Sequence, residues 1–205
     1  LAAIHAFFKY LQRRDPCFLL QCQQILAIEP AKVSKPMVGF LTERELYNVF
    51  DQIDESTVSG RRDAALLRLL YDSAARVQEL CDLRVRDVFL DSEPHVLLHG
   101  KGNKSRYVLI VKDVAQRLSA YIAENHLNRP ECTDMPLFFN QQRKKLTRAG
   151  VSYIVAKYAD AARTLTPSIP KRITPHIFRH TKAMHLCQAG IDMIYIRDTL
   201  GHTDL

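Results

Sequence analysis

The chain has 205 residues and a formal net charge of +7, from 29 basic and 22 acidic side chains. This length suits one ordinary domain plus part of another, and 47% hydrophobic residues are enough for a core. No apolar run approaches the roughly 20 residues of a membrane-spanning helix. The five cysteines are scattered and form no C-x-x-C pair, which argues against a disulfide framework and a zinc site. We therefore expect a soluble cytoplasmic protein whose charge suits a polyanionic partner.

The first part of the chain predicts a helix followed by a linker. Apolar residues at helical spacing indicate a helix from residue 1 that ends before Asp15-Pro16. Residues 17–28 are apolar and fit more than one type of structure. Residues 29–36 contain two prolines and few residues to bury, which is typical of an extended linker. We place a domain boundary here, between residues 1–36 and 37–205.

The second part predicts a mainly α fold with one small antiparallel sheet. Thr42 and Glu45 form a capping box that begins a helix, and Thr174-Pro175 is a good start for another. Runs rich in Val, Leu and Ile indicate short strands. The strands are expected at 88–90, 95–98 and 106–111, and helices at 42–54, from 60, 76–83, from 112, 147–163, 174–190 and 192–201.

Four short motifs stand out in the second part. Residues 174–181 read T-P-H-I-F-R-H-T, and residues 200–202 read L-G-H. In the first of these, His176, Arg179 and His180 are three and four residues apart, which predicts that they project from one side of a helix. Earlier, residues 76–80 read R-V-Q-E-L, and residues 100–106 read G-K-G-N-K-S-R between two predicted strands.

Together these motifs resemble the active site of the tyrosine recombinases, the phage integrase family. The family patterns are R-x-x-E-L, a lysine at a hairpin turn, H-x-x-R-H-[ST] and L-G-[HW], and the chain matches each of them in order. The resemblance implies a tyrosine recombinase catalytic domain over residues 37–205, of the Xer or mobile-element integrase type. It also implies that residues 1–36 are the end of a DNA-binding domain and the linker.

The resemblance implies a role in phosphate chemistry for each motif. Two arginines, Arg76 and Arg179, grip the non-bridging oxygens, because a guanidinium offers paired donors and stays charged. Lys101, at the tip of the hairpin, is the general acid that protonates the leaving 5′ oxygen. His176 and His202 donate to the phosphate or move the proton of the nucleophile.

Two further residues are expected to support the site without acting on the phosphate. Glu79, three residues after Arg76, is expected to orient an arginine. His180 is expected to form a hydrogen bond inside the fold.

The nucleophile of the family is a tyrosine two to three helical turns beyond His202. The chain holds only residues 203–205 there, so it contains no nucleophile. Tyr195 has the wrong spacing and is interpreted as a packing residue. The reaction forms a 3′-phosphotyrosine and needs no cofactor. The implied partner is a double-stranded recombination site, on which the protein is a homotetramer, whereas it is a monomer without DNA.

Other basic residues are candidates for contacts with the DNA backbone. Lys104 and Arg106 follow Lys101 in the hairpin. The run Arg143-Lys144-Lys145 fits a DNA contact and a solvated loop equally well.

Three alternatives stay open at this point. One is a DNA-binding relative that has lost catalysis, and another is a type IB topoisomerase, which shares the fold. The third is a metal-dependent nuclease, because His176-x-x-x-His180 resembles half of a zinc motif. The glutamate of that motif is absent, and an arginine lies between the histidines, so we expect no metal site.

Overall fold

The structure, a computed structural model, describes residues 2–28, 39–100, 102 and 104–201. It divides into two units, Leu1–Met37 and Val38–Leu205, and each is described by itself. The sequence places the boundary one residue earlier, after residue 36.

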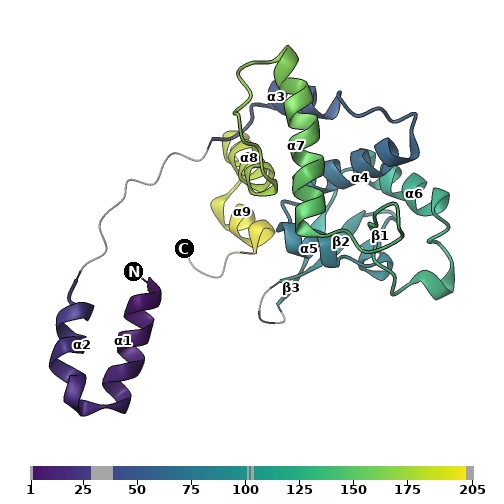
Figure 1. The fold of residues 1–205 in the computed structure, drawn as a ribbon. Coiled ribbons are helices and arrows are strands. Elements are labelled where there is room, and N and C mark those ends of the chain that lie inside the picture. Colours follow the sequence, from purple (N-terminus) through teal and green to yellow (C-terminus); the bar gives the residue numbers. More distant parts are fainter. Residues whose placement is uncertain (1, 29–38, 101, 103, 202–205) are drawn as a thin grey trace. The chain divides into compact units, whose positions relative to one another are not determined.

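Unit 1 is a pair of packed helices (Figure 1). A short 3-10 helix, η1 (Pro16–Phe18), joins α1 (Ala2–Arg14) to α2 (Leu19–Leu26). Asp15 caps η1 by accepting a hydrogen bond from the Cys17 amide at 3.0 Å. The segment of ambiguous pattern, residues 17–28, is therefore largely helical.

Unit 2 is mainly helical with one small sheet, which confirms the fold class predicted from the sequence. Its helices are α3 (Glu43–Phe50), α4 (Val58–Asp72), α5 (Val77–Asp82), α6 (Lys112–Glu124), α7 (Arg148–Leu165), α8 (Pro175–Gln188) and α9 (Met193–Leu200). Its strands are β1 (Val88–Phe89), β2 (His95–His99) and β3 (Ser105–Leu109), and two 3-10 turns lie at η2 (Val85–Asp87) and η3 (Pro130–Cys132).

The three strands form an antiparallel sheet in the order β1-β2-β3. Val96 pairs with Val108, and both side chains are buried, whereas Tyr107 is 68% exposed. This alternation follows from the two-residue period of a strand. The β2–β3 hairpin closes with the Gly100 amide donating to the Lys104 carbonyl at 2.7 Å. Lys101, at the expected tip, lies outside the described residues.

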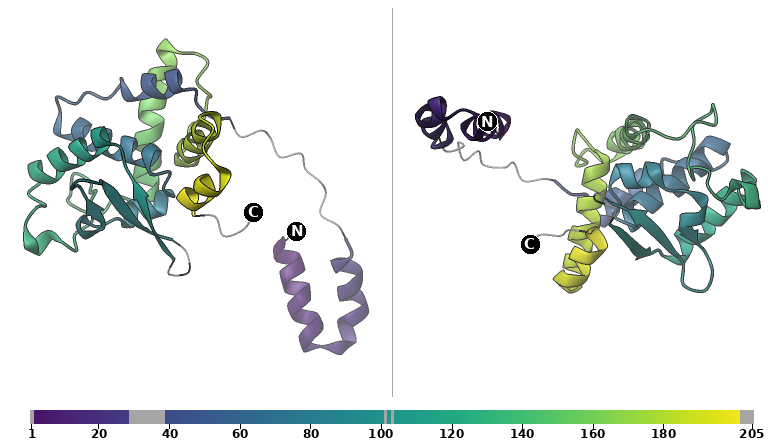
Figure 2. Two further views of the ribbon diagram at one scale, coloured as in Figure 1. Left: turned by 180° about the vertical axis from the view of Figure 1, so that it is seen from behind. Right: turned by 90° about the horizontal axis from the view of Figure 1, so that it is seen from below.

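The helices of unit 2 pack around the long helix α7 and the buried helix α4 (Figure 1). One end of α7 contacts α3, and the other end contacts α5 beside the sheet. Helices α8 and α9 lie together on one side of the unit, as the views from behind and below show (Figure 2). Phe178 of α8 is fully buried and meets the ring of Phe50 at 6.3 Å, so α8 is anchored in the core.

Helix α9 begins and ends where the sequence predicts. The Asp192 side chain caps its first turn, and Gly201 ends it in the left-handed conformation with φ of 62°. Ile196 and Leu200 pack against Ala74, which follows α4. Ala74 also has a positive φ, of 47°, which is uncommon for a residue with a side chain. The end of α9 and the turn after α4 are thus held against each other.

Gly60 in α4 is a position where the fold needs a glycine. A Cβ atom there would lie 1.8 Å from the carbonyl oxygen of Asp54. We expect Gly60→Ala to lower the free energy of unfolding by about 3 kcal/mol, because the backbone must move. Gly150→Ala in α7 is the control, since its Cβ would meet two side chains and no backbone, Leu146 at 3.3 Å and Thr147 Oγ1 at 3.5 Å. It should be neutral or stabilise by up to about 0.5 kcal/mol. Urea unfolding of both variants checks this, and equal losses would contradict it.

Candidate active site

Arg76 is the N-cap residue of α5. Its amide donates to Glu79 Oε2 at 2.9 Å, and its Nη1 donates to Glu79 Oε1 at 2.9 Å. The Arg76 side chain is nevertheless 44% exposed. Its Nη2 donates to the carbonyl of Gly201 at 3.3 Å, just after α9. The first family motif therefore meets the last one in space.

Glu79 is a buried carboxylate at the centre of the site, only 4% exposed. Besides Arg76 it accepts two hydrogen bonds from Arg106 of β3, at 3.1 Å and 2.8 Å. Burial acts to raise the pKa of Glu79, but the hydrogen bonds from Arg106 and Arg76 outweigh it and hold the pKa below its ordinary value. Glu79 is therefore a carboxylate at neutral pH and orients two arginines, as the sequence suggests for one of them.

Arg179 comes to the same place from α8, and it is 5% exposed. Its Nη1 donates to the carbonyl of Ala74 at 2.7 Å, and its Nη2 donates to the carbonyl of Leu200. Burial, with the nearby charges of Arg76 and Arg106, lowers the pKa of the Arg179 guanidinium to about 10. It remains charged at neutral pH, so three guanidinium groups surround one carboxylate.

The two segments that carry Lys101 and His202 reach this arginine cluster. A Cβ atom on Gly100 would lie 3.4 Å from Glu79 Oε1, and one on Gly201 would lie 3.0 Å from Arg106 Nη1. Lys101 and His202 themselves lie outside the described residues.

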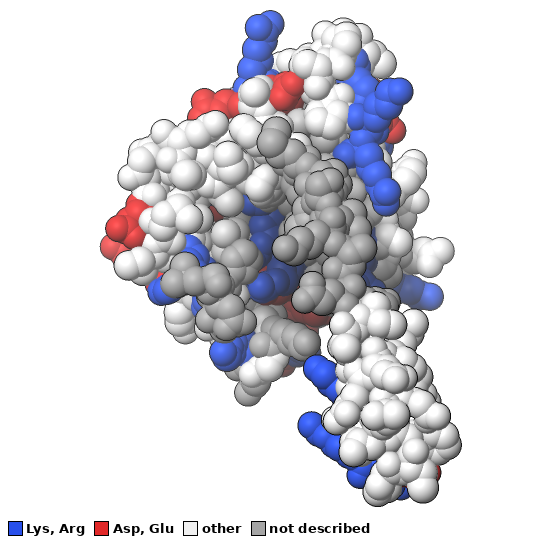
Figure 3. Space-filling model, turned by 90° about the vertical axis from the view of Figure 1, so that its left-hand side faces the viewer, with Lys and Arg blue, Asp and Glu red and all other residues white. Residues whose placement is uncertain are grey.

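The surface view supports a basic character for this face. Figure 3 looks at the side of unit 2 on which α8 and α9 lie, and Lys and Arg side chains gather near the centre of that face. Charge of this sign attracts phosphate.

The remaining residues of the α8 motif have different environments. His176 is exposed, whereas His180 is half-buried and meets the ring of Phe40 edge-on, with the centroids 6.4 Å apart. No hydrogen bond of the His180 ring is found among the described residues. The ring contact with Phe40 is found in place of the expected internal hydrogen bond. His176, Arg179 and His180, which the sequence places on one side of the helix, are therefore exposed, buried and half-buried, respectively.

Two residues of α8 hold the start of unit 2, and the sequence analysis assigned this role to neither of them. Thr181 Oγ1 accepts from the Leu41 amide at 3.0 Å, and His185 Nε2 lies 2.9 Å from the Leu41 carbonyl. Since a carbonyl only accepts, Nε2 carries the proton, and His185 Nδ1 accepts from the Tyr71 hydroxyl at 2.9 Å. Nothing in the sequence points to this role of His185, because its partners come from distant parts of the chain.

The expected DNA-backbone residues divide into exposed and enclosed ones. Lys104 and Lys144 are exposed, and Lys145 pairs with Asp82. Arg106 differs from that expectation, because its side chain is 14% exposed and its guanidinium is held inside the site. The structure thus turns Arg106 away from the surface.

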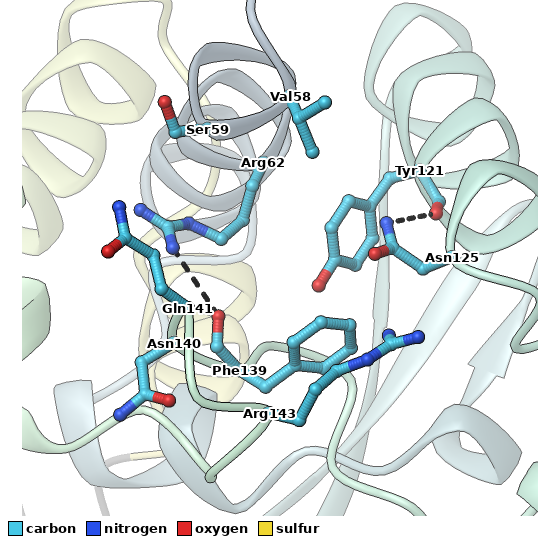
Figure 4. Close-up of a pocket in the computed structure, with 9 residues that line it drawn as sticks. All are labelled: Val58, Ser59, Arg62, Tyr121, Asn125, Phe139, Asn140, Gln141 and Arg143. Carbon is cyan, nitrogen blue, oxygen red and sulfur yellow. Dashed lines mark hydrogen bonds between the residues drawn. The ribbon is translucent and has the colours of Figure 1, made fainter.

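Arg143 lies at a separate cavity of about 410 Å³ (Figure 4). Its guanidinium stands 4.8 Å from the centroid of the Phe139 ring. Val58 and Arg62 of α4 and Tyr121 of α6 line the other walls. The position of Arg143 is therefore set by a local aromatic contact in a part of the unit away from Arg179.

Three further findings bear on the alternatives. In the part of the chain that the structure describes, no group of three or more His, Cys, Asp or Glu side chains could hold a metal ion. Tyr195 is 52% exposed on α9, so its interpretation as a packing residue is wrong. None of the described helices is long and apolar enough to cross a membrane.

Comparison with known sequences gives a consistent set of relatives. Residues 39–205 match the phage integrase family. A putative integrase/recombinase of Sinorhizobium fredii is 35% identical over 204 residues, which cover 98% of this chain and 60% of that protein. The tyrosine recombinase XerC of Bacillus pumilus is 34% identical over 209 residues, which cover 100% of this chain and 66% of that protein. The chain thus spans less than two thirds of either relative.

Solved structures share the fold. The XerA recombinase has a TM-score of 0.68 and 23% identity, over 87% of this chain and 58% of that chain. The XerH site-specific recombinase, bound to its palindromic difH substrate in a post-cleavage complex, has a TM-score of 0.72 and 24% identity. That match covers 87% of this chain and 52% of the XerH chain.

Proposed function

We propose that this chain, which belongs to the phage integrase family, carries the catalytic domain of a site-specific recombinase that cleaves and rejoins duplex DNA. One observation carries the proposal: Arg76 and Arg179, from distant parts of the chain, converge beside the buried carboxylate of Glu79. The cluster holds more positive than negative charge. A scissile phosphate supplies the missing negative charge, and its charge grows in the transition state.

The proposal gives each site residue a role. Arg76 keeps an exposed edge for a phosphate oxygen, while Arg179 is fixed by two carbonyls and offers a second, preorganised guanidinium. Paired donors on two sides of the phosphate orient it for in-line attack. Lys101 protonates the leaving 5′ oxygen, and His176 and His202 donate to the phosphate or move the proton of the nucleophile.

The attacking group is a tyrosine that we place beyond Leu205 in the natural protein. Its attack on phosphorus releases the 5′ hydroxyl and leaves a 3′-phosphotyrosine, which conserves the energy of the broken bond. Neither a metal nor another cofactor takes part in this scheme.

The partner in this proposal is a duplex recombination site in the cytoplasm. Four copies assemble on the DNA, and the free protein is a monomer. The complex of the related XerH with its DNA substrate supports a DNA partner, as does the net charge of +7. Unit 1 would then be the end of a DNA-binding domain, and residues 29–36 the linker.

The proposal is tested with the natural protein, including the residues that follow Leu205. A duplex that the protein binds is first selected from a random library. A nick is then placed near the selected site, so that the short fragment released by cleavage diffuses away and the cleaved strand cannot be rejoined. We expect an SDS-stable protein–DNA adduct that forms in EDTA. Binding without any adduct would instead identify a non-catalytic relative. Cleavage that requires a divalent metal and leaves no adduct would identify a nuclease.

A further inference from the structure

Arg106 joins three separate parts of the active site. It lies on β3, shortly after the hairpin turn, and its Nη1 and Nη2 donate to the two oxygens of Glu79 at 3.1 Å and 2.8 Å. Its Nε donates to the carbonyl of Thr199 at 2.9 Å, in the last turn of α9. Only 14% of the side chain is exposed, so DNA has little access to it. Strand β3, the start of α5 and the end of α9 thus meet at one guanidinium.

The hydrogen bonds of Glu79 show what Arg106 does to Arg76. Arg106 takes both carboxylate oxygens in a fork, whereas the Arg76 side chain takes only Oε1, through Nη1 alone. A carboxylate left alone with one arginine forms the two-pronged pair with that arginine, since this is the strongest geometry. With Arg106 present, Glu79 is already satisfied, and the Arg76 side chain stays 44% exposed.

We infer that Arg106 is a positioning residue of the site: it occupies and neutralises Glu79, so that Arg76 keeps its charge and its free donors for a DNA phosphate. Through Thr199 it also fixes the end of α9, from which His202 follows. The inference rests on the proposed function, because it assigns the phosphate to Arg76. It replaces the expectation that Arg106 binds the DNA backbone.

The test is a suppression experiment in the natural protein. Arg106→Gln frees Glu79 to capture Arg76, and we expect the rate of covalent adduct formation to fall about 100-fold, with DNA affinity within a few-fold of the original. Glu79→Gln removes the captured charge, and its amide can pair with Gln at 106. The double variant Glu79→Gln/Arg106→Gln should therefore form adduct at least about tenfold faster than Arg106→Gln alone.

Two controls separate positioning from a general loss of structure. Arg61→Gln breaks a similar two-pronged pair, between Arg61 and Glu124 at 3.0 Å and 2.6 Å, outside the site and should leave the rate unchanged. Arg106→Lys keeps the charge but not the fork, and it should give an intermediate rate. Urea unfolding identifies any variant that fails to fold. An Arg106→Gln protein that is folded and cleaves within threefold of the original overturns the inference, and so does a double variant no faster than Arg106→Gln.

A second readout does not depend on cleavage. Inorganic phosphate is titrated into the 205-residue chain while the Nε–Hε NMR signal of Arg76 is followed. The phosphate dissociation constant should rise at least about fivefold in Arg106→Gln and return in the double variant. If the 205-residue chain shows this pattern but the natural protein forms no adduct, the recombinase proposal is contradicted and the inference about Arg106 stands. If the natural protein forms adduct at a normal rate but phosphate does not affect the Arg76 signal, the inference about Arg106 is contradicted and the recombinase proposal stands.

Discussion

Arg179→Ala abolishes strand cleavage in the natural protein, with an expected loss of about 1000-fold or more in the rate of adduct formation. The guanidinium is 5% exposed and held by the carbonyls of Ala74 and Leu200, so it meets a phosphate without reorganising. DNA affinity should change by only a few-fold, because most phosphate contacts of a DNA-binding surface lie elsewhere. The single-turnover rate on a nicked substrate and a gel-shift titration measure the two quantities.

The control for this variant is Arg197→Ala on α9, where the half-buried arginine pairs with the adjacent Asp198. It should leave the cleavage rate unchanged. The dependence of the cleavage rate on pH gives a second check. A pKa of about 10 keeps Arg179 charged at every pH below about 9, so the loss of its charge should not lower the rate in that range. Near-normal cleavage by a folded Arg179→Ala protein would show that Arg179 does not bind the scissile phosphate.

Lys101→Ala slows cleavage by about 100- to 10,000-fold, as expected when a general acid is lost. A substrate in which sulfur replaces the bridging 5′ oxygen should restore the rate, because a thiolate leaves without being protonated. Gly100, the residue before Lys101 in the chain, borders Glu79. Single-turnover cleavage of the oxygen and sulfur substrates measures the effect.

Lys104→Ala is the matched control in the same hairpin, since Lys104 is exposed and follows the turn. It should cleave both substrates at the original rate and lose at most a modest, salt-dependent part of the DNA affinity. Rescue by sulfur in Lys104→Ala but not in Lys101→Ala would move the acid to Lys104.

Much of the site could be predicted from the sequence because its signals are local. Arg76 and Glu79 are three residues apart, and the Glu79 carboxylate accepts from both the amide and the guanidinium of Arg76, so one short segment both forms the helix start and sets the ion pair. Thr174 and Pro175 begin α8, and Gly201 ends α9, because few other residues suit those backbone positions.

The rest depends on contacts between distant segments. Arg106 follows a polar turn and is predicted from the sequence to contact the DNA backbone, and only the packing of α9 against β3 places it beside Glu79. His185 has no motif, because its partners Tyr71 and Leu41 lie 114 and 144 residues away in sequence. Tyr195 shows the opposite case, since an aromatic residue in an apolar helix predicts burial but remains on the surface.

The attachment of Leu41 to α8 has a mechanical consequence. Both polar groups of its backbone are held by α8, the amide by Thr181 and the carbonyl by His185. These two residues follow Arg179 by two and six positions on the same helix. A pull on the chain before Leu41 is therefore transmitted to α8 before it reaches the sheet. The helix that carries Arg179 is thus the first part of the unit to take up force from that end.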